Sequence, residues 1–307
     1  MAAQVACTVD LHTHSTASDG QLAPGELVSK AVSVGLCALA LTDHDTVAGI
    51  DEAWSAARHL GCTFVPGVEL SVDWPKGECH ILGYFLDHRS PQLQESLLAF
   101  RESRLTRGKR MVERLDDLGV PLSWERIQEL AQGGTVTRAH VAMALLEAGH
   151  VASRQEAFDR YIGHGRPAYV PRDKLSPEEA IRLIVEAGGI AVLAHPTFVE
   201  PERAWDTSPE RSMPWPFLER LQRAGLRGLE AYYGDYPPSL SERLCSLAAH
   251  YGLLVTGGSD FHGHEERSPL GSVPVPWEAF DNLVQLAQQL GCPGVEEAFL
   301  PLRNDAR

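Results

Sequence analysis

The sequence predicts an α/β barrel one unit short of the eight-stranded form, with a helical insertion in its middle. Three observations predict this fold class. Short apolar runs alternate with helix-like stretches, which is typical of a parallel sheet. Seven such runs occur along the 307 residues, close to the eight of a complete (β/α) barrel. The alternation stops between about residues 90 and 165, where helical periodicity continues without a convincing strand.

The predicted strands are apolar segments bounded by polar residues, glycine or proline. They are Val5–Leu11, Cys37–Leu41, Cys62–Val68, Cys79–Phe85, Ile190–Ala194, Gly228–Ala231 and Leu253–Thr256. Helix-like stretches lie between most of them, at Pro24–Val34, Ile50–Leu60, Pro177–Ala187, Pro216–Ala224 and Ser239–Tyr251. The segment Glu200–Pro216, rich in Pro, Ser and Trp, is expected to form a long surface loop.

The interruption divides the chain into a barrel of residues 1–89 and 166–307 and an insertion of residues 90–165. Within the insertion, Leu98, Leu105 and Val112 recur at seven-residue spacing and predict the apolar face of a helix. Thr137 is a candidate N-cap for a further helix over Arg138–Ala148. Loops at the C-terminal ends of barrel strands carry the chemistry of such folds, so we expect the insertion to act as a lid.

Composition and charge narrow the function classes. The apolar fraction of 44% and charged fraction of 22% are those of an ordinary soluble protein. No apolar run reaches the roughly 18–20 residues of a membrane span, and the first residues lack a secretory pattern, so we expect a cytoplasmic protein with no membrane partner. The net charge of −14 disfavours long DNA, whereas a small phosphorylated substrate or short oligonucleotide remains compatible.

Metal-ligating side chains follow or open the predicted strands. The first strand ends in His12 and His14, which strand alternation places on one face. Alone, this pair is as often two surface histidines as a chelate. The pattern recurs, however, at six strand ends, which chance does not explain, and the sequence therefore predicts a metal cluster. The residues that carry the pattern are His12, His14, His44, Glu69, His80, His195, Asp260 and His262.

The ordered motifs DLHTHSTASDG, LTDHDT, PGVELS, HILGYF, AHP and GSDFHG resemble those of the PHP (polymerase and histidinol phosphatase) family over nearly the whole chain. The resemblance implies a distorted seven-stranded (β/α) barrel with two or three divalent ions. By that resemblance, His12, His14, Glu69 and Asp260 hold one ion, Glu69, His80 and His195 a second, and Asp19, His44 and His262 a third. The carboxylate of Asp19 favours Mn²⁺, with Fe²⁺ or Zn²⁺ as alternatives.

The insertion resembles that of a subgroup, the nucleoside 3′,5′-bisphosphate phosphatases and 5′–3′ exoribonucleases. This resemblance implies a nucleotide or short RNA as substrate. The residues it marks as substrate contacts are Asp19, His44, Arg104, Arg107, Arg138 and His140. Arg107, Arg110 and Arg114 share a helical face, although a basic face of this kind is more often simply solvated. Arg138 lies in a first helical turn, where a bound phosphate is favoured.

The expected reaction is hydrolysis of a nucleotide phosphate ester by a metal-bridging hydroxide. Catalytic roles fall to Glu69, His195, Asp260 and His262, and the flanking Asp43 and Asp45 are candidates to orient imidazoles. Three alternatives stay open: an amidohydrolase, a histidinol-phosphate phosphatase, and a non-enzymatic PHP module. Glu69 disfavours the amidohydrolase, and the insertion with its arginines disfavours the histidinol-phosphate phosphatase. The complete ligand set disfavours the non-enzymatic module. The sequence does not indicate the oligomeric state.

Overall fold

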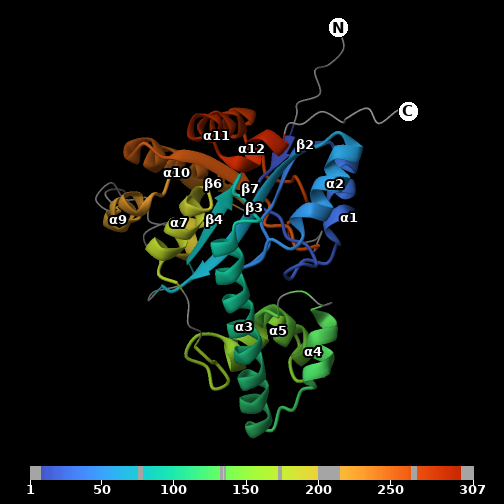
Figure 1. Ribbon diagram of the computed structural model, residues 1–307. Coiled ribbons are helices and arrows are strands. Elements are labelled where there is room, and N and C mark those ends of the chain that lie inside the picture. The colour runs from blue at the N-terminus through green and yellow to red at the C-terminus, as the bar shows by residue number, and fades with distance from the viewer. Residues whose placement is uncertain are drawn as a thin grey trace.

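Seven strands form one sheet whose spatial order follows the chain, as the computed structural model shows (Figure 1). The structure describes residues 8–74, 79–131, 134, 136–171, 175–199, 215–234, 236–263 and 268–298. The strands are β1 (Thr8–Asp10), β2 (Leu36–Leu41), β3 (Thr63–Val72), β4 (Cys79–Tyr84), β5 (Ile190–Leu193), β6 (Gly228–Tyr233) and β7 (Leu254–Gly258). Each of the seven predicted strands is present, and the predicted fold class is confirmed.

The sheet nearly closes, because the segments after β1 and β7 pair. Leu11 N donates to the carbonyl of Gly257 at 3.2 Å, and Asp260 N donates to the carbonyl of His12 at 2.9 Å. Thr13 forms a parallel bridge with Phe261. The residues that follow these two strands therefore lie side by side at one rim of the barrel.

The prediction of an all-parallel sheet is wrong at β4, which runs antiparallel to both β3 and β5. Only six residues separate Val72 from Cys79. A parallel crossover needs about a dozen residues or more, so a connection this short forces a hairpin. The reversal brings the first residues of β4 to the rim where the parallel strands end. His80 therefore reaches the other ligands from the start of its strand.

Helices surround the barrel: α1 (Pro24–Ser33), α2 (Ile50–Leu60), α7 (Pro177–Glu186), α9 (Pro216–Ala224), α10 (Pro238–Tyr251), α11 (Trp277–Leu290) and α12 (Pro293–Ala298). The first five were predicted and the last two were not.

The side chains of β2 show that the barrel has two apolar clusters, one on each face of the sheet. Leu39 and Leu41 belong to the cluster formed with the surrounding helices. Ala38 and Ala40 alternate with them and join the cluster of Val9, together with residues of α11.

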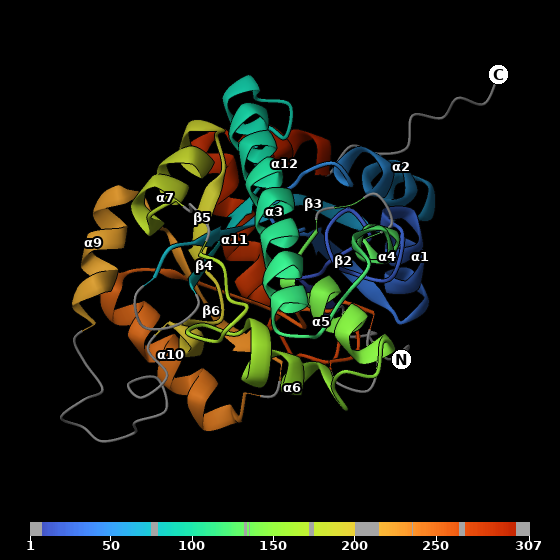
Figure 2. The same cartoon turned by 90° about the horizontal axis from the view of Figure 1, so that it is seen from below.

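The helical insertion comprises α3 (Pro91–Asp117), α4 (Trp124–Leu130), α5 (Arg138–Glu147), α6 (Arg154–Ala157) and a π-helical turn, η1 (Phe158–Ile162). Its described residues contain no strand. A separate apolar core that includes Met111, Ile127 and Leu145 holds these helices together. Figure 2 looks from the side of the insertion and shows α3 and α5 in front of the barrel strands. We propose on this basis that residues 90–165 form a lid domain.

The predicted apolar face of α3 is wrong at Leu98, whose side chain is 58% exposed. Leu93 and Leu97 are buried instead and pack into the barrel core, whereas Met111 and Leu115 pack into the insertion core. The buried positions Leu97, Arg104 and Met111 recur at the predicted seven-residue spacing, but each lies one residue before the predicted set. The spacing of the prediction was therefore right, and its face was displaced by one position, about 100° around the helix.

Two further expectations concern the surface. Residues 200–214 of the predicted loop Glu200–Pro216 lie outside the described residues, and Pro216 begins α9. Among the residues that the structure describes, no helix combines the length and apolar character needed to cross a membrane.

Candidate metal centre

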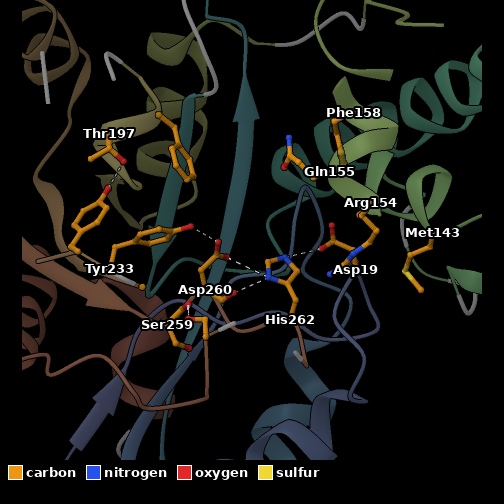
Figure 3. Close-up of a pocket in the computed structure, with 15 residues that line it drawn as sticks. Asp19, Met143, Arg154, Gln155, Phe158, Thr197, Tyr233, Ser259, Asp260 and His262 are labelled. Atoms are coloured by element: carbon orange, nitrogen blue, oxygen red, sulfur yellow. Dashed lines mark hydrogen bonds and ion pairs between the residues drawn. The ribbon is translucent and has the colours of Figure 1, made fainter. Parts of the chain in front are cut away.

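The nine predicted ligands gather at the rim where the parallel strands end. They form three groups of donor atoms within 4.8 Å of one another: His12, His14, Glu69 and Asp260; His44, Glu69 and His80; and His14, Asp19, His44 and His262. His195 joins them through its Nε2, which lies 3.0 Å from Glu69 Oε1. Figure 3 shows Asp260 and His262, both from the segment after β7, and Asp19, from the loop after β1, pointing toward one another.

Glu69 is the centre of this cluster. Its side chain is fully buried in β3. Its Oε2 lies 3.2, 3.3 and 3.0 Å from the nearest nitrogens of His12, His14 and His44. Its Oε1 lies 2.7 Å from His80 Nδ1. A single carboxylate surrounded in this way can bridge two cations.

The donor atoms fit metal ions better than they fit one another. Several are buried without a hydrogen-bond partner among the described residues, including His12 Nε2, His14 Nε2, His44 Nδ1, Glu69 Oε2 and Asp19 Oδ1. Buried polar atoms are rarely left in this state. Two ligands about 2.1 Å from a common ion lie about 3.0–3.4 Å apart. The separations of 3.0–3.3 Å around Glu69 Oε2 match that range.

The charges of the cluster suit cation binding. Burial would raise the pKa of Glu69, but the imidazoles of His44, His80 and His12 outweigh it and lower the pKa well below its usual value. The pKa of Asp260 is likewise lowered despite burial, through His12 and His262. Burial lowers the pKa of His80 to about 4, although Glu69 opposes it. The carboxylates are thus ionised and His80 is neutral at neutral pH. Despite burial, the same carboxylates raise the pKa values of His12, His44 and His195, and that of His262 to about 10, so binding of a cation would release protons from these imidazoles.

Sequence reasoning missed the residue that orients two of the histidines. Glu230 of β6 is fully buried. Its Oε1 lies 2.9 Å from His12 Nδ1, and its Oε2 accepts the backbone N–H of His195 at 2.7 Å. A carboxylate behind an imidazole fixes the ring and increases its basicity. The available signal was a glutamate in the otherwise uncharged strand Gly228–Tyr233, because an acidic side chain is rarely buried without a partner.

The two aspartates expected to orient imidazoles have other partners. Asp43 accepts hydrogen bonds from the backbone N–H and hydroxyl of Ser15, at 2.7 and 2.6 Å, and from the hydroxyl of Ser18 at 2.5 Å. It therefore holds the loop that carries Asp19. Asp45, which has a positive φ of 51°, binds Arg104. This placement depends on residues far apart in sequence, which the LTDHDT motif does not reveal.

Arg104, predicted to contact substrate, is 8% exposed. Its Nε donates to Asp45 Oδ2 at 2.7 Å, and its Nη2 contacts the same oxygen. The Nη2 group also donates to Ser71 Oγ at 2.9 Å. Arg104 therefore joins α3 of the insertion to the segment of the barrel that carries His44.

The other predicted substrate contacts lie close by. Arg107 Nε donates to the carbonyl of Val170 at 2.7 Å. The guanidinium of Arg138 lies over the ring of Phe158, 5.4 Å from its centroid. His140 is buried, and its Nδ1 accepts the backbone N–H of the residue that caps α5 at 3.0 Å. Arg104, Arg107 and Arg138 converge on a recess of about 10 Å³ between α3 and α5.

A larger cavity of about 770 Å³ opens beside the cluster (Figure 3). This volume lies within the range of roughly 300–1,000 Å³ found for small-molecule sites. Metal-cluster residues form one part of its lining: Asp19, Asp260 and His262. The insertion contributes Ala139, Met143, Arg154, Gln155 and Phe158, and the barrel contributes Phe198, Tyr233 and Tyr236, among others. Arg154 was not predicted as a site residue.

The fold and the donor cluster together define a metal-dependent hydrolase of the barrel type, and the comparisons with known proteins specify it. The PHP domain model matches residues 10–164. The 5′-3′ exoribonuclease Rnm of Salmonella typhimurium is 36% identical over 294 residues, covering 94% of this chain and 91% of the relative. The chain belongs to the PHP domain family.

Two further similarities agree with this family. The 3′,5′-nucleoside bisphosphate phosphatase of Chromobacterium violaceum is 35% identical over 263 residues, covering 84% of this chain and 88% of the relative. A solved structure assigned as a metal-dependent phosphoesterase, from Bifidobacterium adolescentis, is 33% identical with a TM-score of 0.79, covering 91% of this chain and 96% of that one. The predictions of a PHP fold and of a hydrolase that acts on phosphoric esters are confirmed.

Proposed function

We propose that this chain hydrolyses nucleotide phosphate esters, as a nucleoside 3′,5′-bisphosphate phosphatase, a 5′–3′ exonuclease on short RNA, or both. The observation that carries the proposal is the cavity of about 770 Å³ between the donor cluster and the insertion. It is large enough for a nucleotide whose phosphate reaches the cluster. Relatives with these two activities align over most of the chain.

We propose that His12, His14, Glu69 and Asp260 hold one divalent ion, that Glu69, His80 and His195 hold a second, and that Asp19, His44 and His262 hold a third. The unpartnered buried nitrogens and oxygens support a metal centre at these residues, as does the absence of cysteine from the three donor groups found among the described residues. The first proposed set is one of those groups, whereas in the other two groups His44 also lies with Glu69 and His80, and His14 with Asp19, His44 and His262. Mn²⁺ fits this nitrogen and oxygen set, with Fe²⁺ or Zn²⁺ as alternatives. Bound ions would supply Lewis acidity, which neutralises phosphoryl charge and makes water a nucleophile at neutral pH.

The chain's own residues then orient and shield the reaction. Glu230 fixes the ring of His12 and the backbone of His195. Tyr233 donates to Asp260 Oδ2 at 2.8 Å and so holds the other carboxylate oxygen toward His12 and His14. Asp260 and His262 both face the cavity, where they can meet the scissile phosphate. The insertion covers this site and limits its exposure to water.

We assign the predicted substrate contacts unequally. Asp19 lines the cavity, and the side chains of His44 and His140 both lie near the Asp19 carboxylate. Arg107 and Arg138 line the recess beside α5, which at about 10 Å³ has room for a water molecule rather than a phosphate. We propose that these two arginines hold a second phosphate outside the recess by charge-assisted hydrogen bonds. Arg104 is engaged by Asp45, and we propose that it positions His44 rather than contacting substrate.

A phosphate-release screen of the Mn²⁺-loaded protein tests the function. We expect adenosine 3′,5′-bisphosphate and a short 5′-phosphorylated RNA to exceed histidinol phosphate in kcat/KM. Equal or faster hydrolysis of histidinol phosphate would favour the histidinol-phosphate alternative. No hydrolysis of any phosphate ester by protein that retains its ions would favour a non-enzymatic module.

The arginine assignment has its own test. Loss of a charged hydrogen-bond partner costs about 1.5–3 kcal/mol, or roughly ten- to hundredfold in rate. Arg138→Ala should therefore lower kcat/KM for the bisphosphate by about that factor. A small aryl phosphate, which carries no second phosphate for Arg138, should be hydrolysed almost as before. Equal loss on both substrates would mean that Arg138 supports the fold only.

A further inference from the structure

A large aromatic side chain stands exposed beside the metal centre. Phe198 ends the short 3₁₀ helix η2 (Pro196–Phe198), three residues after His195. Its side chain is 42% exposed and lines the cavity of about 770 Å³. Single exposed apolar residues are ordinary on a protein surface. This one lies within a concave site next to buried charges, where a bound ligand would cover its exposed side.

The ring of Phe198 is held from behind by two neighbours. Its centroid lies 4.7 Å from that of His195 and 5.8 Å from that of Tyr233, the latter nearly perpendicular at 84°. Tyr233 in turn lies 5.1 Å from Tyr236, whose hydroxyl is 2.7 Å from Thr197 Oγ1. Phe198, Tyr233 and Tyr236 therefore form a supported aromatic wall. A fixed ring with an exposed side loses little conformational entropy when a flat ligand stacks on it.

The insertion provides the facing side of the cavity. Met143 of α5, Gln155 of α6 and Phe158 of η1 line it, and Figure 3 shows Phe158 and Gln155 across the cavity from Thr197 and Tyr233. The cavity thus has an acidic end at Asp19 and Asp260. Away from that end, Phe198, Tyr233, Tyr236 and Phe158 supply aromatic surface beside polar residues such as Arg154 and Gln155. A ligand that matches both ends carries a phosphate at one end and a flat apolar group at the other.

We propose that the aromatic wall is the nucleobase site, with the base of the substrate stacked on Phe198 while its scissile phosphate reaches the donor cluster. This inference rests on the proposed function and adds what determines its specificity. Stacking uses the π-face that every base offers. The site therefore selects nucleosides over other phosphorylated sugars and discriminates weakly among the four bases.

The test compares a nucleotide with its abasic counterpart. Stacking of a base on an aromatic side chain corresponds to about a 5- to 150-fold effect. The wild-type kcat/KM for adenosine 3′,5′-bisphosphate should exceed that for ribose 3,5-bisphosphate by a factor in this range. Phe198→Ala should reduce this preference toward one, and Phe198→Trp should retain it. Calorimetry of chelator-treated protein should show the same trend for adenosine 5′-monophosphate against ribose 5-phosphate.

Two controls separate the base site from other roles of Phe198. Leu60 is similarly exposed, at 44%, and ends α2 at the far end of that helix from His44, so Leu60→Ala should keep the wild-type preference. Elemental analysis of Phe198→Ala should give the wild-type content of bound metal. A lower content would mean that the contact of Phe198 with His195 supports metal binding. Equal loss on both substrates, or a wild-type ratio near one, would overturn the base site. Failure of the wild type to hydrolyse either nucleotide substrate would instead overturn the proposed function.

Discussion

Replacing Arg104 with alanine removes one half of an ion pair that is buried between the insertion and the barrel. The side chains of Arg104 and Asp45 are only 9% and 1% exposed. Asp45 also accepts the backbone N–H of Ser71 at 2.9 Å, and its own N–H donates to the carbonyl of Glu69 at 2.9 Å. In the variant, the Asp45 carboxylate stays buried but loses its cation.

Removing one partner of a buried pair costs about 3–5 kcal/mol, because the remaining charge is uncompensated. For a domain of this size, each kcal/mol shifts Tm by about 2 °C. Arg104→Ala should therefore lower the Tm of unfolding by roughly 6–10 °C, measured by circular dichroism or calorimetry. The double variant Arg104→Ala/Asp45→Asn should recover part of the loss, because it removes the uncompensated charge.

The control is Arg110→Ala, which changes an exposed arginine of the same helix and should leave the Tm nearly unchanged. If Arg104 served only to bind substrate, Arg104→Ala would raise KM and match the Arg110 variant in stability. That result, or a double variant less stable than Arg104→Ala, would refute the positioning role.

Three further predictions concern the metals. Glu69→Gln should lower bound metal by more than one equivalent and abolish turnover, whereas His59→Ala should leave both near normal in elemental analysis and kinetics; retained activity would contradict the bridging role. Asp19→Ala, His44→Ala and His262→Ala should each lose the same single ion in anomalous scattering, and loss of different ions would exclude a shared third site. Glu230→Gln removes the charge behind His12 and should weaken metal binding about 10- to 100-fold, measured by competition with a chelator; an unchanged affinity would mean that Glu230 supports the fold only.

The strands and the candidate ligands could be predicted from the sequence because their signals are local. A short apolar run between turn residues, such as Leu36–Leu41, favours a strand, and parallel strands bring the residues after them to one rim. The sequence therefore predicts that His12 and His44 lie at the same rim, although it does not give the distance between them. The hairpin at β4 was also encoded, in the short link before Cys79, but the alternation of the other strands concealed it.

The tertiary structure alone decided which charged groups meet. Glu230 and His12 are 218 residues apart, and Arg104 and Asp45 are 59 apart. The sequence around Glu230 or Arg104 does not indicate which side chain each one contacts. The same holds for Phe198, which lines one cavity with Phe158 and other residues of the insertion. Periodicity describes how one segment presents its side chains, whereas burial and pairing depend on what another segment places against them, and that is fixed only when the chain folds.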